Sequence, residues 1–244
     1  MMTGGPGIPF NTFTIVARCE STGALGICLA SSPLTVASRC PFVRAGVGAV
    51  STQANTNPKL GPAALDLLAS GHSPAEAIEA LRAEDAWIDH RQIGIVDAAG
   101  RSAAFTGPKT ATWAGHETGP GFVAMGNNLV GEPVVAAIAE NYRASVAEPA
   151  FEERLMAAVE AGRDAGGQEI GHLSGGMIVC GDDAHPRTDL RIEMANPTPK
   201  EGGDAVDDLR RVFNAFKPLI PYYQEWPGNP EMDNWQTWLK KNAG

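Results

Sequence analysis

The sequence predicts an α+β protein arranged as a four-layer αββα sandwich, in which two stacked, mainly antiparallel sheets are flanked by helix pairs. Short segments with period-two alternation come in twos joined by turn residues, which favours antiparallel hairpins. Helical spacing appears in two separate places, over residues 62–70 with the segment after Ser73, and over residues 132–143 with 151–163. Because strands lie between the two helix pairs along the chain, each pair is expected to cover the outer face of one sheet.

Length and charge limit the possible classes of protein. The chain has 244 residues, of which 43% are hydrophobic, enough for one large domain predicted over residues 12–199. Residues 1–11 are predicted to be a mobile leader, and residues 200–244 a C-terminal extension. A net charge of -9 argues against a nucleic-acid partner, whose phosphates would be repelled. No apolar run is long enough to span a membrane and no signal peptide is present, so a cytoplasmic protein with no membrane partner is expected.

Cysteines and histidines give no metal-binding pattern. The cysteines show no C-x-x-C spacing, and in an intracellular chain such thiols stay reduced, so they are predicted to be buried structural residues. The histidines are scattered, with no pair placed on one helical face. We therefore predict no metal and no cofactor. The residues concerned are Cys19, Cys28, Cys40, Cys180, His72, His90, His116, His172 and His185.

The first hairpin places a hydroxyl residue at the head of a strand. Residues 12–18 alternate with period two, a pattern typical of a strand packed on both faces. Turn residues follow at 20–23, and residues 24–31 form the antiparallel partner, whose far end returns beside Thr12. Ser31 and Ser32 are therefore predicted neighbours of Thr12. This placement suggests that Thr12 is a nucleophile.

The next segments supply candidate oxyanion donors and substrate contacts. Residues 40–53 predict two short strands around Gly46. The small residues from Gly48 onward allow the backbone N–H groups of Thr52 and Gln53 to approach a tetrahedral intermediate, unless this run is only a tight strand end. Asn57 either reaches a substrate or forms a plain turn. The helix after Ser73 begins with a capping box. A second hairpin covers 90–97 and 101–106, where His90 and Arg91 either hold a substrate carboxylate or carbonyl, or lie in solvent at a strand end.

Residues 107–131 contain few periodic apolar residues and many glycines, a composition typical of binding loops. Only residues 122–125 are predicted to form a strand there. Trp113 and His116 are candidate pocket residues, and the amides of Asn127 and Asn128 are candidate donors to an oxyanion or a substrate, although asparagine turns are common. Strands at 173–180 and 189–194 and a helix at 204–217 complete the prediction.

Six segments in order resemble one family. They are TFTIVAR, GALGICLASS, FVRAGVGAVSTQANTNP, HRQIGIVDAAGRSAAFTG, WAGH and GFVAMGNNLVG. The chain thereby resembles a bacterial family of unknown function, number one thousand and twenty-eight, which is grouped with the N-terminal-nucleophile hydrolases. The resemblance covers about residues 12–195 and implies the sandwich fold of that superfamily.

The resemblance implies a role for Thr12 and for two neighbours. As an N-terminal nucleophile, Thr12 uses its own α-amino group as general base, with an ordinary pKa near 8. Ser31 is expected to tune the nucleophile. Arg44 stands where proteasome-type enzymes have a lysine, and its charge would lower the pKa of the nearby amine, unless Arg44 reaches solvent from an edge strand. In the family the threonine usually follows the initiator methionine, whereas here eleven residues precede it. Either Thr12 cuts the Asn11-Thr12 bond itself, or another protease does, or the site is blocked.

The predicted function is hydrolysis of an amide, lactam or related C–N bond in a small molecule through an acyl-enzyme formed on Thr12. A glycine-rich loop carrying Trp113 and His116 would leave a small pocket, with Arg91 holding a substrate carboxylate. The alternatives are a non-catalytic binding protein that keeps the fold, or a peptidase. The aromatic tail after residue 218 loosely resembles a peptidoglycan-binding appendage of some family members, or else covers the core or the partner in a homodimer.

Overall fold

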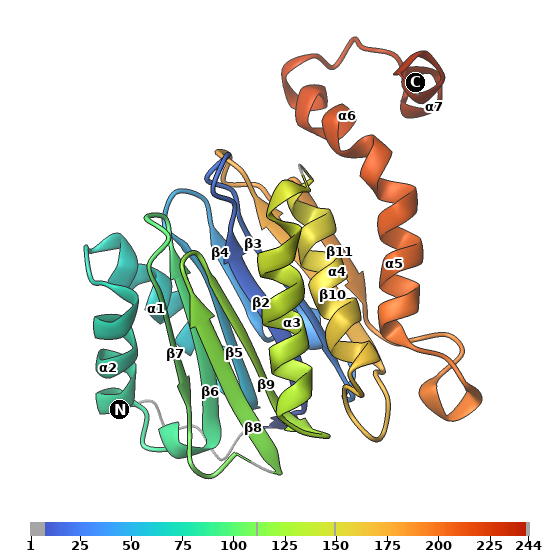
Figure 1. The fold of residues 1–244 in the computed structure, drawn as a ribbon. Coiled ribbons are helices and arrows are strands. Elements are labelled where there is room, and N and C mark those ends of the chain that lie inside the picture. The colour runs from blue at the N-terminus through green and yellow to red at the C-terminus, as the bar shows by residue number, and fades with distance from the viewer. Residues whose placement is uncertain (1–7, 111, 149, 243–244) are drawn as a thin grey trace.

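Two antiparallel sheets form the centre of the molecule (Figure 1). The computed structural model describes residues 8–110, 112–148 and 150–242. The first sheet has the order β1-β5-β6-β7, with β4 also paired to β5, and its strands are β1 (Ile8–Phe10), β4 (Pro41–Arg44), β5 (Gly48–Thr56), β6 (Arg91–Asp97) and β7 (Ser102–Thr106). The second sheet, in order, is β11 (Thr188–Ile192), β10 (Ser174–Cys180), β3 (Leu25–Ser31), β2 (Thr12–Arg18), β9 (Phe122–Leu129) and β8 (Trp113–Gly119).

Helices cover the outer faces of both sheets. The first sheet is covered by α1 (Leu60–Ala69) and α2 (Pro74–Glu84), and the second by α3 (Glu132–Ala144) and α4 (Phe151–Asp164), with α5 (Ala205–Phe216) against β10 and β11. The predicted α+β class with two antiparallel sheets and a helix pair on each side is confirmed. The capping box that starts α2 is also present, formed by Ser73 and Glu76.

Strand β2 shows why the two sheets stack. Its odd-numbered residues, such as Phe13 and Ile15, are buried in the core beneath α3 and α4, whereas Val16 is buried between the sheets against residues such as Val96. Period-two alternation therefore places apolar side chains on both faces of this central strand. Thr12 and Thr14 lie on the same face as Val16, so their hydroxyl groups point toward the other sheet.

Two segments differ from the predictions. The predicted loop around residues 107–121 contains β8, which pairs with β9 as a hairpin. Strand β8 was missed because it is an edge strand with solvent on one side, and polar residues therefore occupy positions that apolar residues fill in a central strand. Of the leader predicted to be mobile, residues 1–7 lie outside the described part of the chain, but Ile8–Phe10 form β1 on the edge of β5.

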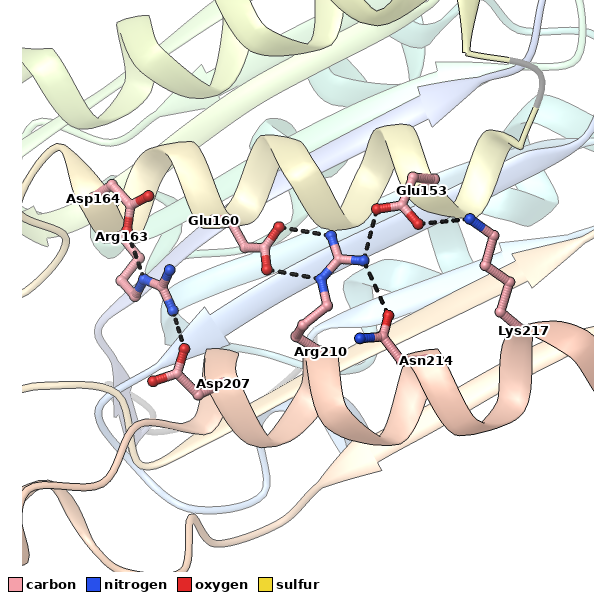
Figure 2. A network of polar contacts seen from close by, with 8 residues as sticks. All are labelled: Glu153, Glu160, Arg163, Asp164, Asp207, Arg210, Asn214 and Lys217. Carbon is pink, nitrogen blue, oxygen red and sulfur yellow. Dashed lines mark hydrogen bonds and ion pairs between the residues drawn. The ribbon is translucent and has the colours of Figure 1, made fainter.

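Helix α5 is fixed to α4 by ion pairs (Figure 2). Arg210 lies 2.6 Å from both Glu153 and Glu160, and Lys217 lies 2.8 Å from Glu153. Burial raises the pKa of Glu153, but hydrogen bonds from Lys217 and Arg210 outweigh it and hold the pKa below its ordinary value. The helix predicted over residues 204–217 is confirmed as α5. It is followed by α6 (Ile220–Glu225) and α7 (Trp235–Asn242), which lie beyond the sheets (Figure 1).

The cysteines are buried and none of the four forms a disulfide, as predicted. Burial raises the pKa of the Cys28 and Cys40 thiols, which keeps them protonated. Within the described ranges, no three His, Cys, Asp or Glu side chains form a group able to hold a metal ion. The helices described also lack the length and apolar run required to cross a bilayer.

Candidate active site

Thr12 lies at the head of β2, opposite the last residue of β3. The antiparallel register pairs Thr12 with Ser31, and their hydroxyl oxygens are 3.1 Å apart. The predicted proximity of these residues is thus confirmed. Thr12 is 0% exposed, so an external substrate has no access to its hydroxyl while the leader is attached.

The carbonyl that precedes Thr12 is held by two donors. The Asn11 oxygen accepts a hydrogen bond from Ser31 Oγ at 2.6 Å and another from the Ser32 backbone N–H at 3.2 Å. A serine hydroxyl has one proton to donate. Because Ser31 gives that proton to Asn11, Thr12 must be the donor in the contact between the two hydroxyls. The hydrogen bonds therefore run from the Thr12 hydroxyl through Ser31 to the Asn11 carbonyl.

The carbonyl of Thr12 itself is held by side-chain amides from two strands, which a third amide orients. Gln53 Nε2 donates to it at 3.2 Å, and Asn127 Nδ2 lies 3.5 Å away. Both amide groups also donate to Gln92 Oε1, at 2.8 and 3.1 Å. Gln92 Nε2 in turn donates to the Gly126 carbonyl at 2.9 Å. Gln92 thereby fixes which way the other two amides face, and we call Gln53, Gln92 and Asn127 the amide cluster.

The predicted oxyanion donors are only partly correct. The Thr52 backbone N–H donates to the Cys40 carbonyl at 3.0 Å, so it is already engaged and faces β4. Gln53 and Asn127 do contact Thr12, but through side chains that hold its own carbonyl. The donors beside the Asn11 carbonyl are instead Ser31 and Ser32. In an extended strand, the N–H and C=O groups of successive residues point to opposite sides. The Thr52 N–H therefore faces away from the site, although Thr52 is next in sequence to Gln53.

Arg44 does not reach Thr12, and this prediction was wrong. Its guanidinium forms an ion pair with Asp66 on α1 at 2.8 Å and is 41% exposed. Arg44 pairs with Gly48, at the opposite end of β5 from Gln53. These two positions are five residue steps apart along the strand, which is roughly 16 Å at about 3.3 Å per residue. The alternative interpretation, an arginine that reaches solvent from an edge strand, is the correct one.

Arg91 is a buried structural residue, so the prediction that it binds a substrate carboxylate was also wrong. It is 1% exposed and pairs with the buried Asp85 at 3.0 Å. Its Nη1 donates to the Asn55 carbonyl and so braces the end of β5. His90 belongs to a short 3-10 helix before β6 and contacts the Trp87 ring.

The other candidate substrate contacts have local structural partners. Asn57 accepts a hydrogen bond from the Lys59 backbone, which makes it a turn residue. Asn128 has a φ of 53° and accepts from the Thr112 hydroxyl at 2.6 Å. Trp113 packs on the core beneath α3 and α4, and His116 contacts the Thr106 hydroxyl at 2.8 Å. Trp113 and His116 thus lie on a strand rather than on a loop over Thr12.

Gln92 was not among the predicted site residues. The signal that could have identified Gln92 is its position next to the apolar run of a central strand. An amide buried there needs hydrogen-bond partners. Ser32 was recognised as a neighbour of Thr12, but the role of its N–H depends on where the Asn11 carbonyl points.

Comparison with known proteins identifies the family of the chain. Residues 12–202 match a family described as "Family of unknown function (DUF1028)". The chain belongs to this family. A solved DUF1028 protein, SPO2555 from Silicibacter pomeroyi, is 30% identical, with a TM-score of 0.76, and the match covers 84% of this chain and 86% of that chain. The match begins at Thr12, the residue on which the site is centred.

A second solved structure is much less similar to this DUF1028 chain. Anbu (ancestral beta-subunit) from Yersinia bercovieri is 10% identical, with a TM-score of 0.40, over 87% of this chain and 96% of that chain. No curated protein matches the chain.

Proposed function

We propose that this DUF1028 protein has an N-terminal-nucleophile hydrolase-like sandwich fold and hydrolyses C–N bonds with Thr12, after the Asn11-Thr12 bond is cut. The observation that supports this best is the Asn11 carbonyl, which is held by Ser31 Oγ at 2.6 Å and by the Ser32 N–H directly beside the Thr12 hydroxyl. Two donors on a carbonyl next to a hydroxyl are the elements of an oxyanion hole with its nucleophile.

The same arrangement supports self-cleavage in balanced steps. Thr12 Oγ attacks the Asn11 carbonyl carbon, its proton passes to Ser31 Oγ, and the Ser31 proton passes to the carbonyl oxygen. The resulting tetrahedral centre re-forms its C=O bond, the C–N bond breaks, and the proton from the carbonyl oxygen goes to the leaving nitrogen. This leaves Asn11 as an ester on Thr12 Oγ. Water then hydrolyses the ester and releases the leader with a free Asn11 carboxylate.

After the cut, the new α-amino group of Thr12 supplies the general base, with an ordinary pKa near 8. An external amide would place its carbonyl where the Asn11 carbonyl lies, with Ser31 and Ser32 as donors. The amide cluster holds the Thr12 carbonyl and so keeps the amine and the hydroxyl oriented. The acyl-enzyme and its hydrolysis repeat the two halves of the self-cleavage reaction.

The substrate is proposed to be an amide, a lactam or a related C–N compound. The prediction of a small molecule rested partly on a loop around Trp113, and that segment is strand β8. Small substrates therefore remain a proposal to be tested against peptides, and the homodimer remains a prediction. A non-catalytic binding protein is the second candidate, favoured by the complete burial of Thr12 in the uncut chain.

Mass spectrometry of the purified protein tests the proposal. We expect a mature chain that begins at Thr12, and Thr12→Ser should also be cut, whereas Thr12→Ala should keep its leader. Ser31→Ala removes one of two oxyanion donors and should slow cleavage by about 10²–10³-fold. Ser38→Ala is the matched control, because Ser38 is exposed and lies outside the site. A wild-type chain that keeps its leader under all conditions would refute the enzyme, whereas cleavage of Thr12→Ala at the same bond would refute self-cleavage.

A further inference from the structure

The leader strand β1 fills a defined stretch of one sheet edge. Ile8, Pro9 and Phe10 pair with Thr56, Asn55 and Ala54 of β5. Ala54 also pairs with Arg91 of β6, so β1 lies on the side of β5 that faces away from β6. Strand β4 covers the first part of that same edge, through residues 48–51 of β5. Among the described strands, β1 is therefore the one that pairs with residues 54–56 on this edge.

The directions of the backbone N–H and C=O groups of residues 54–56 determine which of them can bind the leader. The Asn55 carbonyl accepts from Arg91, so it points to the β6 side. In an antiparallel pair, neighbouring residues alternate in direction, so Thr56 directs its N–H and C=O groups toward β1, whereas Ala54, with a φ of 67°, interrupts the regular alternation. Pro9 agrees with this register, because a proline has no N–H to donate and stands opposite Asn55.

The leader also ends at the reaction centre. The chain leaves β1, passes through Asn11 and enters β2 at Thr12, and the Asn11 carbonyl is the group held by Ser31 and Ser32. The leader is thus placed as the acyl side of the amide bond that Thr12 faces. An external acyl group bonded to Thr12 Oγ would extend from the same carbonyl position along the same edge.

We infer that residues 54–56 of β5 form a binding site for the acyl side of an extended peptide substrate, which adds as a strand once the leader has left. An open strand edge presents unpaired N–H and C=O groups that a peptide backbone can satisfy. The edge stays in place without the leader, because the Arg91 bond to the Asn55 carbonyl braces it from the opposite side. The cleavage reaction in this inference rests on the proposed function, whereas the binding does not.

Peptide binding tests the inference without any turnover. The probe is the synthetic peptide Gly-Ile-Pro-Phe-Asn, the sequence of residues 7–11, and the protein is a chain that begins at residue 12, where the family match also begins. We expect the peptide to bind this chain and not the full chain with Thr12→Ala, whose edge is filled. Methylation of the backbone nitrogen of the isoleucine, which would stand opposite Thr56, should weaken binding about tenfold. Equal binding of the methylated peptide, or no binding, would overturn the inference.

The full-length Thr12→Ala chain supplies a second measurement if the shortened chain does not fold. Ile8→Pro removes an N–H that faces β5, and it should raise amide hydrogen exchange at Thr56 by about tenfold or more. Pro9→Ala is the matched control, because the nitrogen of residue 9 faces away. Unchanged exchange in Ile8→Pro would show that the leader is not held on this edge.

Activity separates the inference from the proposed function. For an active enzyme, kcat/KM on peptidyl amides should rise as the acyl side grows from one residue to three. Turnover that does not depend on acyl length would overturn the edge site and leave the hydrolase intact. Peptide binding with no turnover of any amide would keep the edge site and refute the hydrolase.

Discussion

Gln92→Met tests whether the amide cluster positions Thr12. Gln92 is fully buried, and its Oε1 accepts from Gln53 Nε2 and Asn127 Nδ2 at 2.8 and 3.1 Å. Its Nε2 donates to backbone carbonyls, including that of Gly126 at 2.9 Å. Methionine has a similar volume and leaves no large cavity, so the change removes hydrogen bonds with little loss of packing.

The expected loss of stability follows from these bonds. Two bonds to Oε1 and two from the amide protons disappear, and a net hydrogen bond contributes about 1 kcal/mol, which gives about 4 kcal/mol. Partial repair by the remaining contacts of Gln53 with Thr12 reduces this to about 3 kcal/mol. Urea denaturation measures the difference, and Gln236→Met on the exposed face of α7 is the control, with an expected change within about 0.5 kcal/mol.

A second readout separates positioning from stability. Gln92→Glu keeps an acceptor for Gln53 and Asn127 but places a carboxylate oxygen against the carbonyl of Gly126, so it should be less stable than Gln92→Met. Both variants should slow removal of the leader under conditions in which they remain folded. A Gln92→Met chain as stable as wild type, with leader removal at the wild-type rate, would refute the positioning role.

Two further variants test interactions that hold the fold. Arg91→Met leaves the buried carboxylate of Asp85 unpaired and should lower the free energy of unfolding by about 3–5 kcal/mol, and denaturation at the wild-type urea midpoint would contradict this. Glu153 has a folded-state pKa below its ordinary value of 4.5, so its stabilising contribution is complete above that pH and is lost as pH falls through the lowered pKa. Thermal unfolding should therefore depend less on pH between about 3 and 6 in Glu153→Gln than in wild type. An unchanged dependence would show that Arg210 and Lys217 gain nothing from this charge.

The parts of the site that depend on local pattern could be predicted. Alternation over β2, turn residues at 20–23 and the length of β3 together fix the register, which brings Ser31 beside Thr12. Helix α2 and its capping box follow from three neighbouring residues. In both cases the sequence separation is short, so the geometry of one turn or one helical start decides the outcome.

The parts that depend on the second sheet could not be predicted. Arg44 was assigned to the site because it is a charge in an apolar run, but its register with Gly48 sends it to the other end of β5. Gln92 acts through contacts with Gln53 of its own sheet and Asn127 of the other. Such contacts depend on how the sheets stack, and a hydrophobic pattern does not specify which polar residues meet across them.

Cleavage of the Asn11-Thr12 bond would also decide whether the edge of β5 is open. Within the described residues, strand β1 pairs through three residues, so it gains a few net hydrogen bonds at about 1 kcal/mol each. Ordering those residues costs about 1–2 kcal/mol each in backbone entropy, which cancels most of the gain. The covalent link, which holds the leader at high effective concentration, is therefore what keeps β1 in place. Once that link is cut, the leader becomes a free peptide that binds weakly and occupies residues 54–56 only at high concentration, so the step that creates the Thr12 amine also opens residues 54–56 to a substrate.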